Sequence, residues 1–120
     1  MNFFKKKYVL RRYSTPQNMN GYITTPFADQ LLLMDIQTVE AIVKPDTDGF
    51  ETVQKLKVFC DFEIFVENDE LQKKADRIWF QNKWFICISS RLSENTPLRH
   101  WTSTFIECQD KEEAPGGILL

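Results

Sequence analysis

The sequence predicts an all-β fold, a small antiparallel β-barrel or sandwich with long inter-strand loops and room for one short helix. Apolar and polar side chains alternate with a period of two in at least four segments, which is typical of half-buried strands. Turn-forming residues separate these segments about every eight to twelve residues. Residues 74–88 add two aromatic and β-branched runs around a polar pair, the pattern of a β-hairpin.

The composition fits one domain with one core. The chain has 120 residues, of which 42% are hydrophobic and 13% aromatic, and these values exclude global disorder. We expect residues 1–108 to form a single β-barrel domain. Residues 109–120 contain Pro115, two Gly and a run of charges, so we expect a flexible C-terminal tail.

The first half of the chain is expected to contain two clear strands. Residues 7–13 alternate as a first strand, and residues 14–21 follow as a loop with a strong turn signal at Asn20-Gly21. A short extended piece is expected at residues 22–27. Residues 28–34 are good helix formers, so a helix is conceivable there. Residues 36–43 have β-branched side chains on both alternating faces and predict a strand that ends at Pro45, before a turn.

The second half of the chain is expected to add a long strand, a hairpin and a last strand. Residues 53–67 alternate strongly, with Leu56, Val58, Cys60, Phe62 and Ile64 on the buried face. A polar loop follows at residues 68–75. The hairpin is expected to turn at Asn82-Lys83, because Asn tolerates the positive φ of hairpin turns. A loop at 90–98 leads to the last strand at 99–107.

Charge and cysteine content limit the classes of function. The net charge of −2 and the pI of about 5.4 argue against a protein that grips nucleic acid by its phosphates. The three cysteines are widely spaced and include no C-x-x-C pair, so neither a disulfide framework nor a zinc site is expected. We expect a cytoplasmic protein without a secretory signal or membrane span.

No residue pattern predicts catalysis. His100 is the single histidine and lacks a nucleophile partner in any known motif. Asp46 and Asp48 resemble the start of a calcium loop, but the closing Glu is missing and a turn is favoured. We expect no enzymatic activity, metal or cofactor. A small nucleic-acid-binding barrel stays open as an alternative, since residues such as Trp79 and Trp84 can stack on bases.

Six short motifs occur in a fixed order between residues 8 and 108. They are Arg11-Arg12-Tyr13-Ser14-Thr15-Pro16, Gly21, Lys44-Pro45, Ala75-Asp76, Asn82-Lys83-Trp84 and His100-Trp101. In this order the chain resembles the small head–tail connector proteins of tailed bacteriophages, of the head-closure or stopper type. It departs from them at Asn82-Lys83, where the family's turn usually contains Gly, and at Lys44-Pro45, where Gln-Pro is common.

The resemblance implies a structural protein of the virion neck. Such a protein is a β-barrel subunit without catalytic residues, and its ring joins the DNA-filled head to the tail and helps retain packaged DNA. The implied partners are portal or adaptor connector proteins and tail proteins of the same phage. The ring is expected to contain six or twelve copies in the virion. The free protein is expected to be a monomer in the host cytoplasm, where the ring is assembled, and no membrane is expected to take part. A tail-terminator or tail-tube-like virion protein is the alternative.

Loops over a rigid barrel are the expected contact surfaces. Subunit or partner contacts are predicted at Asp46, Asp48, Phe50, Glu51, Arg91, Glu94, Asn95 and Pro97. A channel-facing loop, past which genomic DNA slides without specific binding, is predicted at Asn68, Asp69, Glu70, Lys73 and Lys74.

Overall fold

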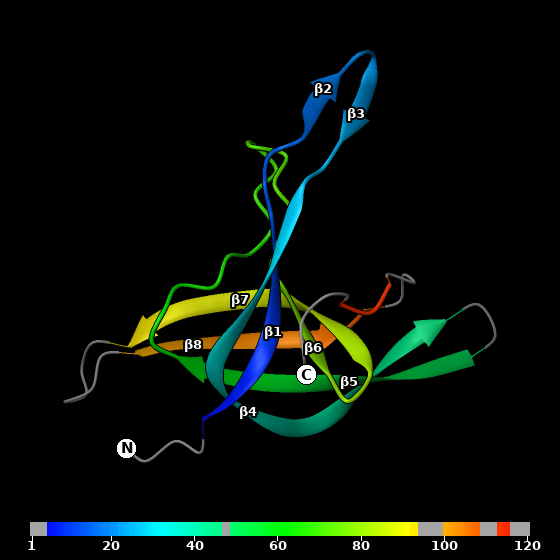
Figure 1. Cartoon of the computed structure of the whole chain (residues 1–120). Coiled ribbons are helices and arrows are strands. Elements are labelled where there is room, and N and C mark those ends of the chain that lie inside the picture. Colours follow the sequence, from blue (N-terminus) through cyan, green and yellow to red (C-terminus); the bar gives the residue numbers. More distant parts are fainter. Residues whose placement is uncertain (1–4, 47–48, 94–99, 109–112, 116–120) are drawn as a thin grey trace.

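The computed structural model describes residues 5–46, 49–93, 100–108 and 113–115, and these residues contain no helix. Six antiparallel strands close into a barrel in the order β1-β4-β5-β8-β7-β6, and β6 pairs back onto β1 (Figure 1). They are β1 (Lys6–Tyr13), β4 (Phe27–Asp46), β5 (Gly49–Cys60), β6 (Arg77–Phe80), β7 (Lys83–Ser93) and β8 (His100–Glu107). A separate hairpin, β2 (Gln17–Met19) and β3 (Tyr22–Thr24), connects β1 to β4. The predicted all-β barrel is confirmed.

The expectation that residues 28–34 could form a helix is wrong, because these residues belong to β4. They pair with β1 along an unbroken register from Tyr13↔Phe27 to Lys6↔Met34. Apolar side chains occupy both faces of this stretch, and that arrangement hides the period of two. The ladder with β1 therefore overrides local helix propensity. The strand also continues through Pro45 to Asp46, opposite the beginning of β5.

The buried face predicted for β5 is confirmed, although the strand is shorter than expected. Leu56 and Val58 are fully buried and Cys60 is 1% exposed, while Lys57 between them is exposed. Regular pairing ends at Cys60, and the chain then continues as an irregular segment to Asp76. Ile64 in this segment still packs in the core.

The hairpin β6–β7 is confirmed, with its turn one residue earlier than predicted. Phe80 pairs with Lys83, so the turn residues are Gln81 and Asn82, whose φ values are 51° and 62°. Both values match the left-handed turns that fit the twist of hairpin strands. β7 then continues to Ser93, so the predicted loop at 90–98 is wrong for residues 90–93.

Side chains fill the interior of the barrel. The core cluster consists of Leu10, Met34, Leu56, Val58, Cys60, Ile64, Ala75, Ile78, Phe85, Cys87 and Phe105. Side chains occupy the interior in this way in most small barrels. The candidate binding surfaces are therefore the outside of the barrel and the segments that project from it.

Candidate assembly surfaces

The hairpin β2–β3 forms an arm that projects away from the barrel (Figure 1). Its turn lies at Asn20 and Gly21, with φ values of 53° and 87°, as the Asn-Gly signal predicts. The Asn18 side chain accepts a hydrogen bond from the Gly21 amide at 3.2 Å. The sequence predicts a loop at 14–21, and this is wrong for the strand β2 within it.

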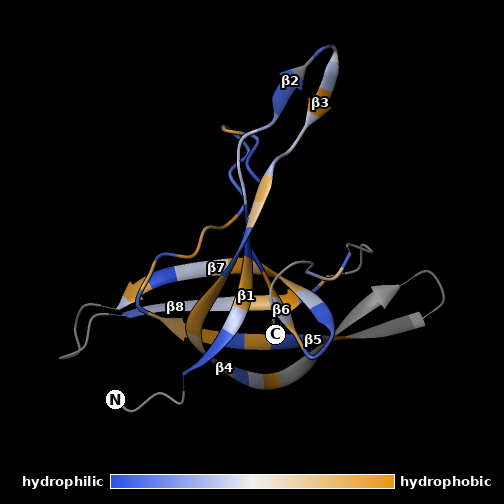
Figure 2. Ribbon diagram, viewed as in Figure 1, coloured by the Kyte–Doolittle hydropathy of each residue, from blue (hydrophilic) through white to orange (hydrophobic). Residues whose placement is uncertain are grey.

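The tip of the arm carries exposed apolar side chains. Tyr22 and Ile23 on β3 are 74% and 78% exposed, the largest exposed fractions among the apolar residues described as exposed. Figure 2 shows the hydrophilic β2 beside the partly hydrophobic β3. No charged residue occurs between Arg12 and Asp29, in a chain that is 27% charged. Aromatic side chains and depletion of charge are the composition of a protein–protein contact.

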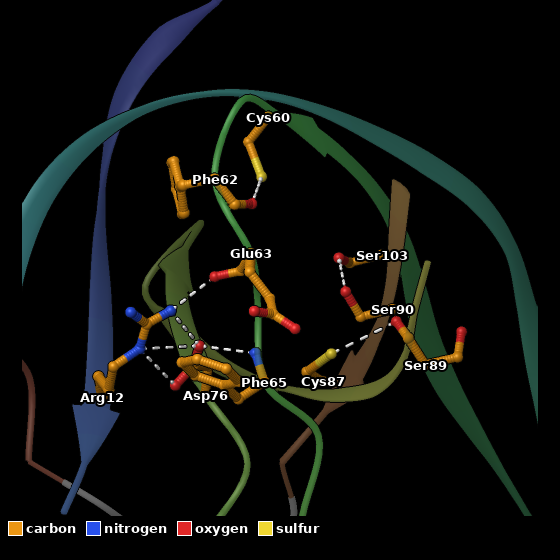
Figure 3. A network of polar contacts seen from close by, with 10 residues as sticks. All are labelled: Arg12, Cys60, Phe62, Glu63, Phe65, Asp76, Cys87, Ser89, Ser90 and Ser103. Carbon is orange, nitrogen blue, oxygen red and sulfur yellow. Dashed lines mark hydrogen bonds and ion pairs between the residues drawn. The ribbon is translucent and has the colours of Figure 1, made fainter. Parts of the chain in front are cut away.

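The base of the arm is held on one side by a network around Asp76 (Figure 3). Asp76 is fully buried, and its Oδ2 lies 2.8 Å from the Arg12 guanidinium and accepts the Phe65 amide at 2.9 Å. The guanidinium also donates to the Glu63 carbonyl at 2.7 Å and lies 4.4 Å from the centre of the Phe65 ring. The network joins the end of β1 to the irregular segment that follows β5.

A second pair holds the opposite face of β1. Arg11 donates two hydrogen bonds to the Asp29 carboxylate, at 2.7 and 2.9 Å, and is only 5% exposed. Its guanidinium lies 4.0 Å from the centre of the Phe27 ring and 4.3 Å from the Trp84 ring. Neighbouring arginines of β1 therefore fix both faces of the strand just before the arm begins, so the arm projects from a rigid base.

The predicted channel-facing loop is a compact turn near the base of the arm. Asn68 and Lys73 form a β-bridge, and the Asn68 side chain accepts the Leu71 amide at 3.1 Å. The Lys73 and Lys74 ammonium groups lie over the rings of Phe65 and Tyr13, at 4.4 and 5.2 Å. Asp69 and Glu70 are exposed, as is Leu71 at 56%. In Figure 1 this segment projects to the same side as the arm.

The first group of predicted contact residues lies on paired strands, not on a loop. Asp46 pairs with Gly49, Pro45 with Phe50 and Lys44 with Glu51. These positions form the end of an extension of β4 and β5, so the prediction that these contact residues lie on a loop is wrong for Asp46, Phe50 and Glu51. Asp48 lies outside the described residues.

The second group of predicted contact residues begins on β7. Arg91 is exposed and pairs with Thr102 of β8, while Glu94, Asn95 and Pro97 lie outside the described residues. Figure 1 places the end of β7 and the β4–β5 extension on opposite sides of the barrel. The structure therefore separates the two predicted contact regions.

The described side chains offer little for catalysis. None of the His, Cys, Asp and Glu residues in the described ranges gather in groups of three or more that could hold a metal. His100 is 6% exposed and lies beside the Phe59 ring. Burial raises the pKa of Cys60 to about 11 and that of Cys87 to about 12, so neither thiol is an activated nucleophile. Within the same residues, no helix has the length and apolar character of a membrane span.

Comparison with known proteins gives no family for this chain. No protein-family model matches the sequence, and no curated protein matches it. The fold and its surfaces are therefore the basis for a functional assignment. The exposed Tyr22 and Ile23 were not singled out from the sequence, although the uncharged stretch around the Asn20-Gly21 turn is visible in it.

Proposed function

We propose that this protein is a structural subunit of a bacteriophage neck, of the head-closure type. A ring of its copies joins the DNA-filled head to the tail and helps to retain the packaged DNA. The observation that carries the proposal is the arm, an uncharged hairpin with exposed Tyr22 and Ile23 on a filled barrel. The ordered motifs resemble the connector family, and this resemblance is the reason for proposing that the arm acts in a phage neck.

The rigid base of the arm supports an assembly role. The arm begins directly after Arg11 and Arg12, whose carboxylate partners Asp29 and Asp76 are both buried or nearly so. A projecting element with a fixed base loses little conformational entropy when it docks, which favours binding. An arm of this kind suits contact with a neighbouring protein.

Ring formation requires two different contact patches on each subunit, because ring contacts are head-to-tail. The arm and the β4–β5 extension project from separate sides of the barrel, and β7 ends on the side opposite the extension (Figure 1). This distribution supports lateral contacts to neighbouring copies together with axial contacts to portal or adaptor proteins and tail proteins. The proposed sites of action are the host cytoplasm during assembly and then the head–tail interface of the virion. No reaction is assigned to the protein.

Disruption of the gene in the phage that encodes it tests the proposal. We expect electron micrographs of the lysate to contain separate heads and tails, and a plasmid copy of the gene to restore joined particles. Intact infectious particles without the protein would contradict a neck function. Tails of irregular length would instead support the tail-terminator alternative.

A further inference from the structure

The outer face of β5, β8 and β7 carries a row of polar side chains unlike the apolar arm. Lys57 of β5 lies opposite Thr104 of β8, and Thr104 lies opposite Ser89 of β7. In the next row, Thr102 lies opposite Arg91. Lys57 and Thr104 alternate with the core residues Leu56, Val58 and Phe105, so they point away from the barrel interior, and Ser89 and Arg91 beside them are exposed.

This face is hollowed rather than flat. A hollow of about 260 Å³ is lined by Lys57, Ser89, Ser90, Arg91, Thr102 and Thr104. A second hollow of about 200 Å³ shares Lys57 and Thr104 with it and adds Lys55. The register of β7 against β8 shifts between Cys87 and Ser89, and such an irregularity bends a strand. The two hollows form one groove, which we call the β5–β8–β7 groove.

None of the ion pairs formed by the side chains that the structure describes involves Lys55, Lys57 or Arg91, whereas Arg11 and Arg12 are paired with carboxylates. No carboxylate is among the described residues that line the two hollows. On the adjoining β4, Asp35 lies opposite Phe59 and is only 7% exposed. The groove thus combines three positive charges with a set of hydroxyl groups.

We propose that the β5–β8–β7 groove binds phosphate groups of the double-stranded DNA backbone. Lys, Arg, Ser and Thr side chains are the usual partners of DNA phosphates, and phosphate contacts carry no sequence information. The described residues of the groove lining include no aromatic ring on which an unpaired base could stack. Duplex backbone is therefore a better match than single strands.

The groove suits DNA better than the loop predicted to face the channel. That loop carries exposed Asp69 and Glu70, and its Lys73 and Lys74 lie over aromatic rings. Three phosphate contacts correspond to weak, non-specific affinity, near or weaker than about 10⁻⁴ M at physiological salt. Weak contacts let DNA slide past the protein. The inference goes beyond the proposed neck function, because a purified subunit can bind DNA whether or not it joins heads to tails.

Fluorescence anisotropy of a short labelled duplex at low salt tests the inference with the whole protein. If three phosphates are neutralised, the logarithm of the association constant is expected to fall linearly with the logarithm of the salt concentration, with a slope of about −2.7. The variant Lys55→Gln/Lys57→Gln/Arg91→Gln is expected to lose most of this binding and to bring the slope close to zero. The control Lys6→Gln/Lys7→Gln removes exposed cations of β1 and is expected to keep the wild-type slope.

The location of the contact is tested separately by amide chemical shifts in the wild-type protein. Addition of the duplex is expected to shift the amide signals of Ser89, Thr102 and Thr104 more than those of Tyr22 and Ile23 on the arm. No duplex binding at low salt, or unchanged binding by the triple variant, would overturn the inference. Equal competition by a polyglutamate peptide of matched charge would also overturn it, since the groove would then be a site for acidic protein segments.

Discussion

At the scale of single residues, Asp76 is the centre of the fold's polar network. Its carboxylate binds the Arg12 guanidinium and the Phe65 amide, while its own amide donates to the Phe65 carbonyl at 2.9 Å. Its carbonyl accepts the Cys87 amide at 3.0 Å. One buried residue therefore connects β1 to the irregular segment after β5, as Figure 3 shows, and its backbone carbonyl also binds β7.

Asp76→Asn is expected to lower the free energy of unfolding by about 2–3 kcal/mol. The change removes the negative charge that compensates Arg12, whose side chain is 33% exposed and keeps part of its hydration. Urea unfolding measures the loss. The control is Asp61→Asn, since Asp61 is 72% exposed in its pair with Lys5 and is expected to cost at most about 1 kcal/mol. Equal effects of the two changes would contradict the central role of Asp76.

The buried thiols predict that stability falls above about pH 9. Burial is the main cause that raises the pKa of Cys60 and Cys87, from 9.0 to about 11 and about 12. Above pH 9 the unfolded chain loses these protons while the folded chain keeps them, so unfolding is favoured as pH rises. The expected decline is at most about 1.4 kcal/mol per pH unit for each thiol.

Urea unfolding between about pH 8 and pH 9.5 measures this decline, because tyrosine, with an ordinary pKa of about 10, is still mostly protonated there. Cys60→Ala/Cys87→Ala is expected to flatten the profile, even if the variant is less stable at every pH. An unchanged slope in this variant would show that other groups cause the decline.

The sequence contains Arg12 and Asp76 as parts of recognisable motifs, but their contact could not be predicted from it. The two residues are separated by 64 positions, and only closure of the barrel by β6 on β1 brings them together. The same is true of the groove, in which Lys57 and Arg91 come from strands on either side of β8. The sequence therefore shows which residues are charged or polar, but it does not show which distant residues they contact in the fold.

At the scale of elements, strands with one apolar face were predictable and strands with two were not. β5 has clear alternation around Lys57, and its buried face was predicted correctly. β4 has Leu31 and Leu33 exposed beside the fully buried Met34, so its pattern is compatible with a helix as well. The hairpin turn was displaced by one residue because Gln81, which adopts a φ of 51°, is not a typical turn residue.

The arm is expected to matter for assembly and not for folding. Tyr22→Ser/Ile23→Ser replaces exposed side chains, so the free energy of unfolding is expected to change by no more than about 0.5 kcal/mol per substitution. In the phage, the same variant is expected to reduce the fraction of heads joined to tails, counted by electron microscopy. The matched control is Ile88→Ser, which removes an apolar side chain that is 49% exposed on the barrel. Normal joining by the arm variant would exclude the arm as a contact.

At the scale of the whole molecule, the barrel is stable enough in principle to exist without neighbours. Its core cluster is continuous, and each barrel strand pairs with a neighbour on both sides over part of its length. Open strand edges remain on the short β2–β3 hairpin and on the β4–β5 extension, both proposed as assembly contacts. Folding and assembly are thus assigned to different parts of the molecule, so one can proceed without the other.

We therefore expect the isolated protein to be a monomer at micromolar concentration and to form its ring only on a viral partner. Weak contacts become effective on a template, because a high local concentration raises avidity by about 10²–10⁴ without new contacts. Sedimentation velocity of the purified protein measures the free state, and is expected to give one species near 14.2 kDa. The same measurement on the Tyr22→Ser/Ile23→Ser variant serves as the control for self-association through the arm. A stable hexamer or dodecamer of the isolated wild-type protein would contradict template-dependent assembly.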